Sequence, residues 1–134
     1  MEEKPRIVVL DDDEVFAAMV SAALEENYAV AVGRNGCDGL RFCRAGRTDL
    51  LITDIGMPEL DGLQMLEKFQ KDRQLAAIPV IIVTATHFYH RKLSDAKRYP
   101  QVRGIICKPS GVEQILTEVQ RVLQESCGSG PTAP

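Results

Sequence analysis

Hydrophobic and polar residues follow one another in blocks along the chain, and five short apolar blocks predict buried strands. The first block, IVVL, is rich in β-branched residues and stops abruptly at four acidic residues. Apolar blocks that end in polar residues are typical of strands covered on both faces. The predicted strands are residues 6–10, 28–32, 49–53, 79–84 and 102–107.

Helical spacing of apolar residues appears between these strands. A first helix is predicted from residue 14 to about residue 26, with Asp13 as its N-cap. A second covers residues 37–45, where Leu40 and Cys43 share a face, and a third covers residues 61–73. A fourth falls between residues 87 and 103, and the last, with the clearest apolar face, covers residues 112–123.

The regular alternation of strands and helices predicts an α/β fold. Parallel neighbours need crossover helices, and right-handed crossovers dominate, so we expect a doubly wound, five-stranded parallel sheet with helices on both faces. Residues 1–125 are predicted to form one domain. Residues 126–134, SCGSGPTAP, have the composition of a flexible tail or linker.

Composition and charge narrow the classes of function. The chain has 134 residues, 45% of them hydrophobic, which suffices for one core, and its net charge of −3 argues against direct nucleic-acid binding. No basic leader precedes an apolar run, and no run approaches ~20 residues, so neither a signal peptide nor a membrane span is expected. The cysteines and histidines lack zinc-ligand spacing, and we expect reduced thiols, Cys107 packed within its strand, and a cytoplasmic location.

Polar residues follow most of the predicted strands, at the edge where ligands bind in open α/β sheets. Asp11 and Asp12 follow the first strand, Asp54 the third, Thr84 ends the fourth, and Lys108 follows the fifth. Two like charges ~4 Å apart repel by about 4 kcal/mol at an effective dielectric near 20, so clustered carboxylates need a proton or a cation. Oxygen ligands favour Mg²⁺ or Mn²⁺ over zinc. A carboxylate can then act as a nucleophile toward phosphorus, with the lysine and threonine contacting phosphoryl oxygens.

From about Pro5 to Gln124 the chain resembles the receiver domains of response regulators in two-component signalling, chemotaxis receivers among them. The likeness rests on the acid pair after IVVL, on DLLITDIGMPELDG, on PVIIVTA and on the KP pair at Lys108 and Pro109. It implies a flavodoxin-like strand order of 2-1-3-4-5. It also implies a signalling protein that catalyses only its own phosphorylation and dephosphorylation, not a conventional enzyme.

The resemblance assigns a role to each acidic residue. Asp54 would be the phospho-acceptor, receiving its phosphoryl group from a histidine kinase or a phosphotransfer protein. Asp12 would bind the Mg²⁺ ion directly and Asp11 through a metal-bound water. Asp54 itself and the main-chain carbonyl of Gly56 would complete the protein ligands.

The resemblance also implies a switch. Lys108 would contact the phosphoryl group, the peptide before Pro109 would be cis, and Thr84 would shift on phosphorylation. Receivers often have Tyr or Phe three residues before the lysine, but this chain has Ile105, which argues against an aromatic switch.

A downstream protein partner is expected on the face formed by the fourth helix, the fifth strand and the last helix, with no role for nucleic acid or membrane. Basic residues gather there, so we expect either a docking site for an acidic partner or a solvated face. The basic residues are Arg91, Lys92, Lys97, Arg98 and Arg103.

Two alternatives remain open. VVLDDDE also fits the opening of haloacid-dehalogenase-like phosphatases, with Asp11 as nucleophile and Asp13 as general acid, although no later acidic pair follows the lysine and Asp54 would have no role. The other alternative is a degenerate receiver that acts only as a docking module.

Overall fold

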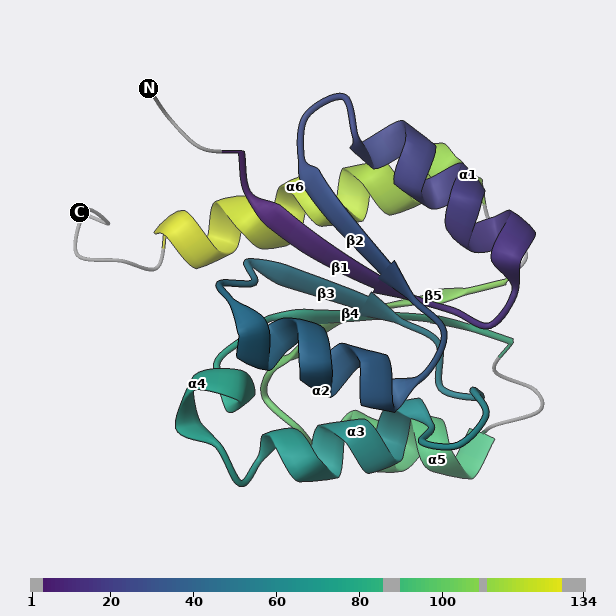
Figure 1. The fold of residues 1–134 in the computed structure, drawn as a ribbon, viewed down its shortest axis with the longest axis vertical. Helices are drawn as coiled ribbons and strands as arrows, with labels where there is room; N and C mark the ends of the chain where they lie inside the picture. Colours follow the sequence, from purple (N-terminus) through teal and green to yellow (C-terminus); the bar gives the residue numbers. More distant parts are fainter. Residues whose placement is uncertain (1–3, 86–89, 109–110, 129–134) are drawn as a thin grey trace.

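A computed structural model of the chain describes residues 4–85, 90–108 and 111–128. Figure 1 shows one central sheet between two layers of helices. Its strands are β1 (Arg6–Leu10), β2 (Ala29–Gly33), β3 (Leu50–Thr53), β4 (Val80–Thr84) and β5 (Val102–Cys107).

The sheet is entirely parallel and has the order β2-β1-β3-β4-β5. This confirms the predicted fold class and strand order. The direction in which successive strands are added to the sheet reverses at β1, because β2 lies on one side of it and β3 on the other. Leu10 is opposite Thr53, so the residues that follow β1 and β3 leave the sheet side by side. The register of β1 and β3 therefore brings Asp11 and Asp54 to the same edge of the sheet.

Helices cover both faces of the sheet, α1 and α6 one face and α2, α3 and α5 the other (Figure 1). Asp13 caps α1 as predicted, because its side chain accepts a hydrogen bond from the Phe16 amide. The helices are α1 (Glu14–Leu24), α2 (Gly36–Ala45), α3 (Gly62–Phe69), α4 (Arg73–Ala76), α5 (His90–Ala96) and α6 (Val112–Gly128).

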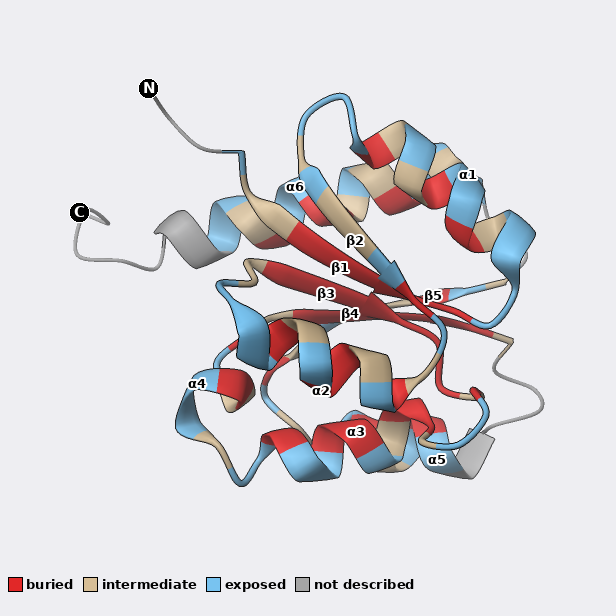
Figure 2. Cartoon of the chain, viewed as in Figure 1, coloured by how far each residue is buried: buried red, intermediate tan, exposed pale blue. Residues whose placement is uncertain are grey.

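Alternate strand residues belong to two separate cores, visible as the buried interior in Figure 2. In β1, Ile7 and Val9 pack with the α1 and α6 side, whereas Val8 and Leu10 pack with the α2 and α3 side. Both sets are almost completely inaccessible to solvent. Burial on both faces explains why β1, β3 and β4 are runs of mainly apolar residues instead of alternating with polar ones.

The structure corrects the predicted helix boundaries in two places. The helix predicted over 61–73 ends at Phe69, and the short α4 begins again after Asp72, whose side chain accepts from the amides of Gln74 and Leu75. The predicted fourth and last helices are therefore α5 and α6. The last helix continues to Gly128, so the linker expected from residue 126 begins inside it.

Cys107 is another correction, because it is exposed and not packed within β5. It lies at the last position of the strand, opposite Thr84. Leu40 and Cys43 share the buried face of α2, as predicted. In the described part of the chain, no helix is both long and apolar enough to cross a membrane.

Candidate functional site

The carboxyl edge of the sheet brings together side chains from three different strands. Asp11 follows β1, Asp54 follows β3 and Lys108 follows β5. The carboxylates of Asp11, Asp12 and Asp54 each offer an oxygen, and these atoms all lie within 4.8 Å of one another. The predicted convergence of the acidic residues is therefore present in the fold.

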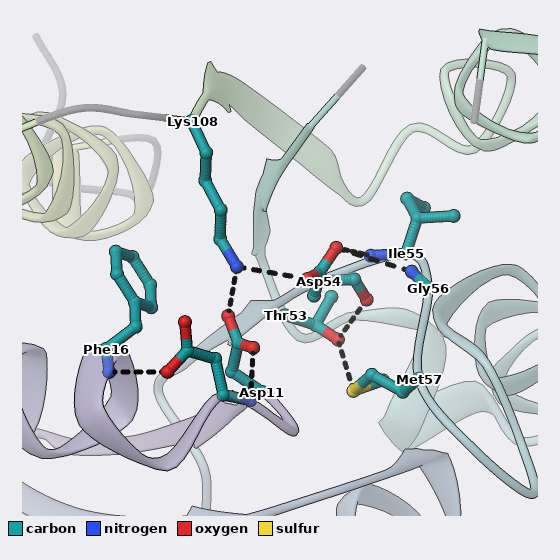
Figure 3. A network of polar contacts seen from close by, with 9 residues as sticks. Asp11, Phe16, Thr53, Asp54, Ile55, Gly56, Met57 and Lys108 are labelled. Atoms are coloured by element: carbon teal, nitrogen blue, oxygen red, sulfur yellow. Dashed lines mark hydrogen bonds and ion pairs between the residues drawn. The ribbon is translucent and has the colours of Figure 1, made fainter. Parts of the chain in front are cut away.

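Lys108 joins two of these carboxylates. Its Nζ lies 2.8 Å from Asp11 Oδ2 and 3.1 Å from Asp54 Oδ2 (Figure 3). Burial lowers the pKa of the ammonium, but its hydrogen bonds and charge interactions with Asp11 and Asp54 outweigh burial and raise the pKa above its usual value. The lysine is therefore a permanent cation between two acids at neutral pH.

Asp11 is the most deeply buried of the three acids, with 3% of its surface exposed, while Asp12 is exposed. Asp11 Oδ1 accepts from the Asp13 amide at 2.9 Å. Burial raises the pKa of the Asp11 carboxyl; the bonds from Lys108 and Asp13 oppose this shift without cancelling it. The charge on Asp11 is thus only partly compensated, which favours uptake of a cation.

Asp54 uses its two carboxylate oxygens differently. Oδ1 accepts from the amides of Ile55, at 2.6 Å, and Gly56, at 3.3 Å, whereas Oδ2 faces Lys108 (Figure 3). These amides fix the carboxylate plane by a turn of the chain immediately after β3. The Gly56 main chain therefore lies beside Asp54, and its assignment as a metal ligand stays a prediction.

The loop after Asp54 is held by contacts with α2 and α3. The Gly62 amide donates to the Ile55 carbonyl at 2.8 Å, and a Cβ at Gly62 would overlap the Asp54 carbonyl oxygen. The Gly36 amide donates to the Leu60 carbonyl at 2.7 Å. The main chain at Gly62 lies too close to the Asp54 carbonyl for a side chain to fit, which explains why a glycine follows the acid in the ELDG segment.

Asp61 is the N-cap of α3 and does not belong to the cluster formed by Asp11, Asp12 and Asp54. It forms a capping box with Gln64, and its Oδ2 pairs with Lys92 of α5 at 2.6 Å. Lys92 was predicted to belong to a basic docking patch, but its ammonium group forms an ion pair within the fold. Arg103 pairs with Glu125 at 3.0 Å, and the Arg91 side chain lies outside the described part of the chain.

Thr84 ends β4 with a completely buried side chain. Its main-chain carbonyl accepts from the Lys108 amide at 2.9 Å, so β4 and β5 remain paired up to the site. Among the described residues its hydroxyl Oγ1 has no hydrogen-bond partner. A buried, unpaired hydroxyl costs free energy in the resting fold, and an incoming oxygen acceptor could recover that cost.

Ile105 is on the same face of the sheet as Thr84, since Thr84 is opposite Cys107 and Ile82 opposite Ile105. It is half-buried against the core on the α5 side. With Lys97, Ile105 lines a surface hollow of about 360 Å³ beside β5. A branched aliphatic side chain thus fills the position where the family often has an aromatic ring.

Phe16 is a residue of the site that sequence reasoning missed. Its ring in the first turn of α1 lies beside Lys108, with Nζ 4.6 Å from the ring centroid (Figure 3). Phe16 falls within the first predicted helix, and no local sequence pattern connects it to a lysine after the last strand. Pro109, with its predicted cis peptide, lies outside the described residues.

The donor set fits a hard divalent cation. Asp11, Asp12 and Asp54 form the only group of three or more clustered acids, histidines or cysteines in the described chain. Carboxylate oxygens without histidine or thiolate ligands suit Mg²⁺ or Mn²⁺. Asp13, by contrast, accepts from the Phe16 amide at 3.1 Å as a helix cap, which leaves it poorly placed as the general acid of a phosphatase.

Comparisons with known proteins agree with this arrangement. Residues 7–120 match the model of the response regulator receiver domain. Protein PilH of Pseudomonas aeruginosa is 33% identical over 119 residues, covering 88% of this chain and 97% of that protein. The DNA-binding dual master transcriptional regulator RpaA of Synechocystis is 30% identical over 91% of this chain, which spans only 50% of RpaA.

Solved structures agree in fold as well. A CheY-like response regulator receiver domain protein from Methanospirillum hungatei superposes with a TM-score of 0.83 at 25% identity, over 96% of this chain and 100% of that chain. The signal receiver domain of a histidine kinase from Syntrophus aciditrophicus gives a TM-score of 0.80 at 28% identity, over 97% of this chain and 94% of that one. The chain belongs to the response regulator receiver domain family of two-component signalling.

Proposed function

We propose that this receiver domain accepts a phosphoryl group on Asp54 in a Mg²⁺-dependent reaction and returns it to water. The donor would be a phosphohistidine of a histidine kinase or phosphotransfer protein, in the cytoplasm. The observation that carries the proposal is the ammonium of Lys108 bridging Asp11 and Asp54, at 2.8 and 3.1 Å, beside a third carboxylate. Three acids and one lysine on a parallel sheet edge suit phosphoryl transfer.

In the transfer step, a carboxylate oxygen of Asp54 forms a bond to phosphorus as the bond from phosphorus to the donor imidazole nitrogen breaks. The imidazole leaves with the electron pair of that bond and takes up a proton. The Ile55 and Gly56 amides orient Asp54 through Oδ1, which leaves the side of Oδ2 toward Lys108 for the reaction. Hydrolysis of the resulting acyl phosphate would restore the carboxylate.

Asp11, Asp12 and Asp54 would hold the ion, together with the proposed Gly56 carbonyl. When bound, Mg²⁺ supplies positive charge that offsets the repulsion between the entering phosphoryl group and the carboxylates. Lys108 would contribute a second positive charge by turning from Asp54 Oδ2 to a phosphoryl oxygen. The raised pKa of Lys108 keeps that charge in place at neutral pH.

Thr84 would respond to the phosphoryl group on Asp54. The phosphoryl group adds charge near −2 at Asp54 and strong acceptor oxygens. The buried Thr84 hydroxyl has no partner in the described structure and would gain one by moving toward the phosphoryl group. Ile105 lies on the same face of the sheet and would repack in response, without the aromatic rotation common in the family.

The output would be a change of partner affinity at the face formed by α5, β5 and α6. This face keeps the exposed cations Lys97 and Arg98, and Lys97 lines the hollow beside Ile105. An acidic partner surface would complement it. Replacing Lys97 with Glu should weaken partner binding measured by titration calorimetry at low salt, while Lys68→Glu, on α3, serves as a matched control. Equal effects of the two changes would contradict the assignment of this face.

The phosphorylation itself is tested by intact mass spectrometry after incubation with acetyl phosphate, with Mg²⁺ or with EDTA. The wild type should gain one phosphoryl group only with Mg²⁺, and Asp54→Asn should gain none. Asp49→Asn, which changes an acid at the opposite edge of the sheet, is the control and should be phosphorylated normally. No gain in the wild type would favour a docking module instead.

A further inference from the structure

Phe16 makes a contact with the active-site lysine that the roles above do not use. The residue lies in the first turn of α1, where its amide donates to the side chain of the N-cap Asp13 at 3.1 Å. This bond fixes the start of the helix, and with it the direction in which the half-buried ring leaves α1. The ring then lies alongside Lys108, 4.6 Å from centroid to Nζ (Figure 3).

An ammonium at this distance from an aromatic ring is attracted by the negative face of the ring. The attraction grows as water is excluded, and only 20% of the Lys108 side chain is exposed. A lysine has a flexible four-carbon stem and is otherwise free to take several directions. Lys108 is therefore held by three groups, namely the carboxylates of Asp11 and Asp54 and the ring of Phe16.

The ring differs from the two carboxylates in one respect. Asp11 and Asp54 belong to the acid cluster that suits a divalent cation, and a cation bound there would compete with Lys108 for their charge. Phe16 offers only its neutral ring, which is no ligand for a hard cation. Its attraction for the lysine is therefore the one that remains when the carboxylates are engaged.

We propose that Phe16 is a positioning residue for phosphoryl transfer: its ring holds the Lys108 ammonium beside Asp54, so that the positive charge is in place when the phosphoryl group arrives. This inference rests on the proposed phosphorylation of Asp54. Phe16 touches no reacting atom and acts through Lys108 alone. A merely structural role is the competing explanation, because Phe16 also packs against the core on the α1 and α6 side.

Three kinds of variant separate the two explanations. Phe16→Leu keeps an apolar side chain and removes the aromatic face. Phe16→Tyr keeps the face. Site-specific replacement of Phe16 by mono-, di- and trifluorophenylalanine keeps the shape of the ring and weakens its negative face stepwise. Thermal unfolding of each variant shows whether it is folded before any rate is compared.

The first readout is the NMR shift of the Lys108 ε-methylene group in metal-free protein. A ring beside the side chain should displace this resonance, and Phe16→Leu should return it toward the value of an ordinary lysine, while Phe16→Tyr should leave it displaced. The shift reports the contact whether or not Asp54 is ever phosphorylated. A Lys108 resonance that does not change in Phe16→Leu would overturn the inference.

The second readout is the rate of phosphorylation by acetyl phosphate at saturating Mg²⁺. Phe16→Leu should be slower by about tenfold, Phe16→Tyr within about twofold of the wild type, and the fluorinated series should slow stepwise. Equal rates across the fluorinated series, or no rescue by Phe16→Tyr, would assign Phe16 a structural role and overturn the proposal. A wild type that is not phosphorylated at all would instead overturn the proposed function. Because the Lys108 shift does not depend on phosphorylation, this failure can be distinguished from a failure of the inference about Phe16.

Discussion

The two edges of the sheet both carry charged side chains, but they balance charge in different ways. At the amino edge, the Arg6 guanidinium donates to the carbonyls of Phe42 and Arg47 and to Thr48 Oγ1. Asp49 accepts from the Arg6 amide at 2.8 Å and from Arg47 Nε at 3.0 Å. Each charge there meets an opposite charge or a polar backbone group, so the amino edge fastens loops to the sheet.

The carboxyl edge gathers like charges instead. Asp11, Asp12 and Asp54 lie within 4.8 Å of one another, and Lys108 pairs with two of them. The hollow at the amino edge, about 530 Å³, is larger than the hollow of about 390 Å³ that Asp11 lines. The size of a hollow therefore does not identify the edge that carries the candidate site. The unbalanced charge identifies it, and so does the Thr84 hydroxyl, which has no hydrogen-bond partner among the described residues.

The largest contrast is expected between two glycines. A Cβ at Gly62 would overlap the Asp54 carbonyl oxygen and lie 3.0 Å from Ile55 Cα, while a Cβ at Gly46 would meet only the Arg6 guanidinium, at 3.9 Å. Gly62→Ala should lower the free energy of unfolding by about 2–3 kcal/mol and slow phosphorylation. Gly46→Ala should stay within about 0.5 kcal/mol of the wild type. Urea unfolding measures both.

Backbone is the obstacle at Gly62, so the loop cannot yield by a side-chain rotation. If Gly62→Ala unfolded like the wild type and was phosphorylated at the same rate, the loop would not position Asp54 as the structure indicates.

Removing the charge of Asp11 and removing that of Asp49 should change the free energy of unfolding in opposite directions. Burial raises the pKa of Asp11, so its charge opposes folding, and Asp11→Asn should raise the free energy of unfolding in metal-free buffer by about 1 kcal/mol. Asp49→Asn should lower it by a similar amount, since two donors would lose a charged acceptor. Differential scanning calorimetry measures the two effects.

Mg²⁺ sharpens the same comparison. A ligand that binds only the folded state raises the melting temperature. Mg²⁺ should therefore raise the melting temperature of the wild type and of Asp49→Asn, and much less that of Asp11→Asn. An equal rise in all three proteins would place the metal away from the carboxyl edge.

The smallest effect is a pH dependence. The Arg34 amide and the Arg41 guanidinium lower the pKa of Asp38, so this acid stabilises the fold above its ordinary pKa of 3.8, and that stability is lost as pH falls through the lowered value. Asp38→Asn should cost less than about 1 kcal/mol at pH 7.

The contribution of Asp11 to stability depends on pH in the opposite direction. Because its pKa is raised, the free-energy cost of its charge disappears as pH falls toward 3.8. On acidification the Asp38→Asn and Asp11→Asn proteins should therefore approach the wild type from opposite sides. Unfolding curves between about pH 3 and pH 7, roughly the range in which carboxyl groups titrate, test this. Parallel curves for the two variants would contradict it.

Local patterns were sufficient for the strands and for the acid cluster, because parallel strands of one sheet end at one edge. They failed where contacts are distant or polar. Nothing near Phe16 indicates Lys108, because the contact joins the first turn of α1 to the residue that follows β5, far away in the sequence. The end of α6 was missed because apolar spacing stops at Leu123, whereas Glu125 continues the helix through ion pairs with Arg103 and Arg121.

Two further errors have equally physical causes. The apolar character of Cys107 suggested burial, but the strand reaches the open edge at that residue. The helix predicted over 61–73 was divided because Asp72 competes for backbone amides and starts α4. Glu59 adopts a positive φ of 66° in the loop before α3, a conformation that its residue type does not suggest.

The most direct test of the account is the identity of the phosphorylated residue. Protein treated with acetyl phosphate and Mg²⁺ is reduced with borohydride, which converts an aspartyl phosphate to homoserine, and is then mapped by peptide mass spectrometry. Homoserine at position 54, and at no other aspartate, is the predicted result. Homoserine at position 11 would contradict it and would favour the phosphatase-like chemistry in which Asp11 is the nucleophile.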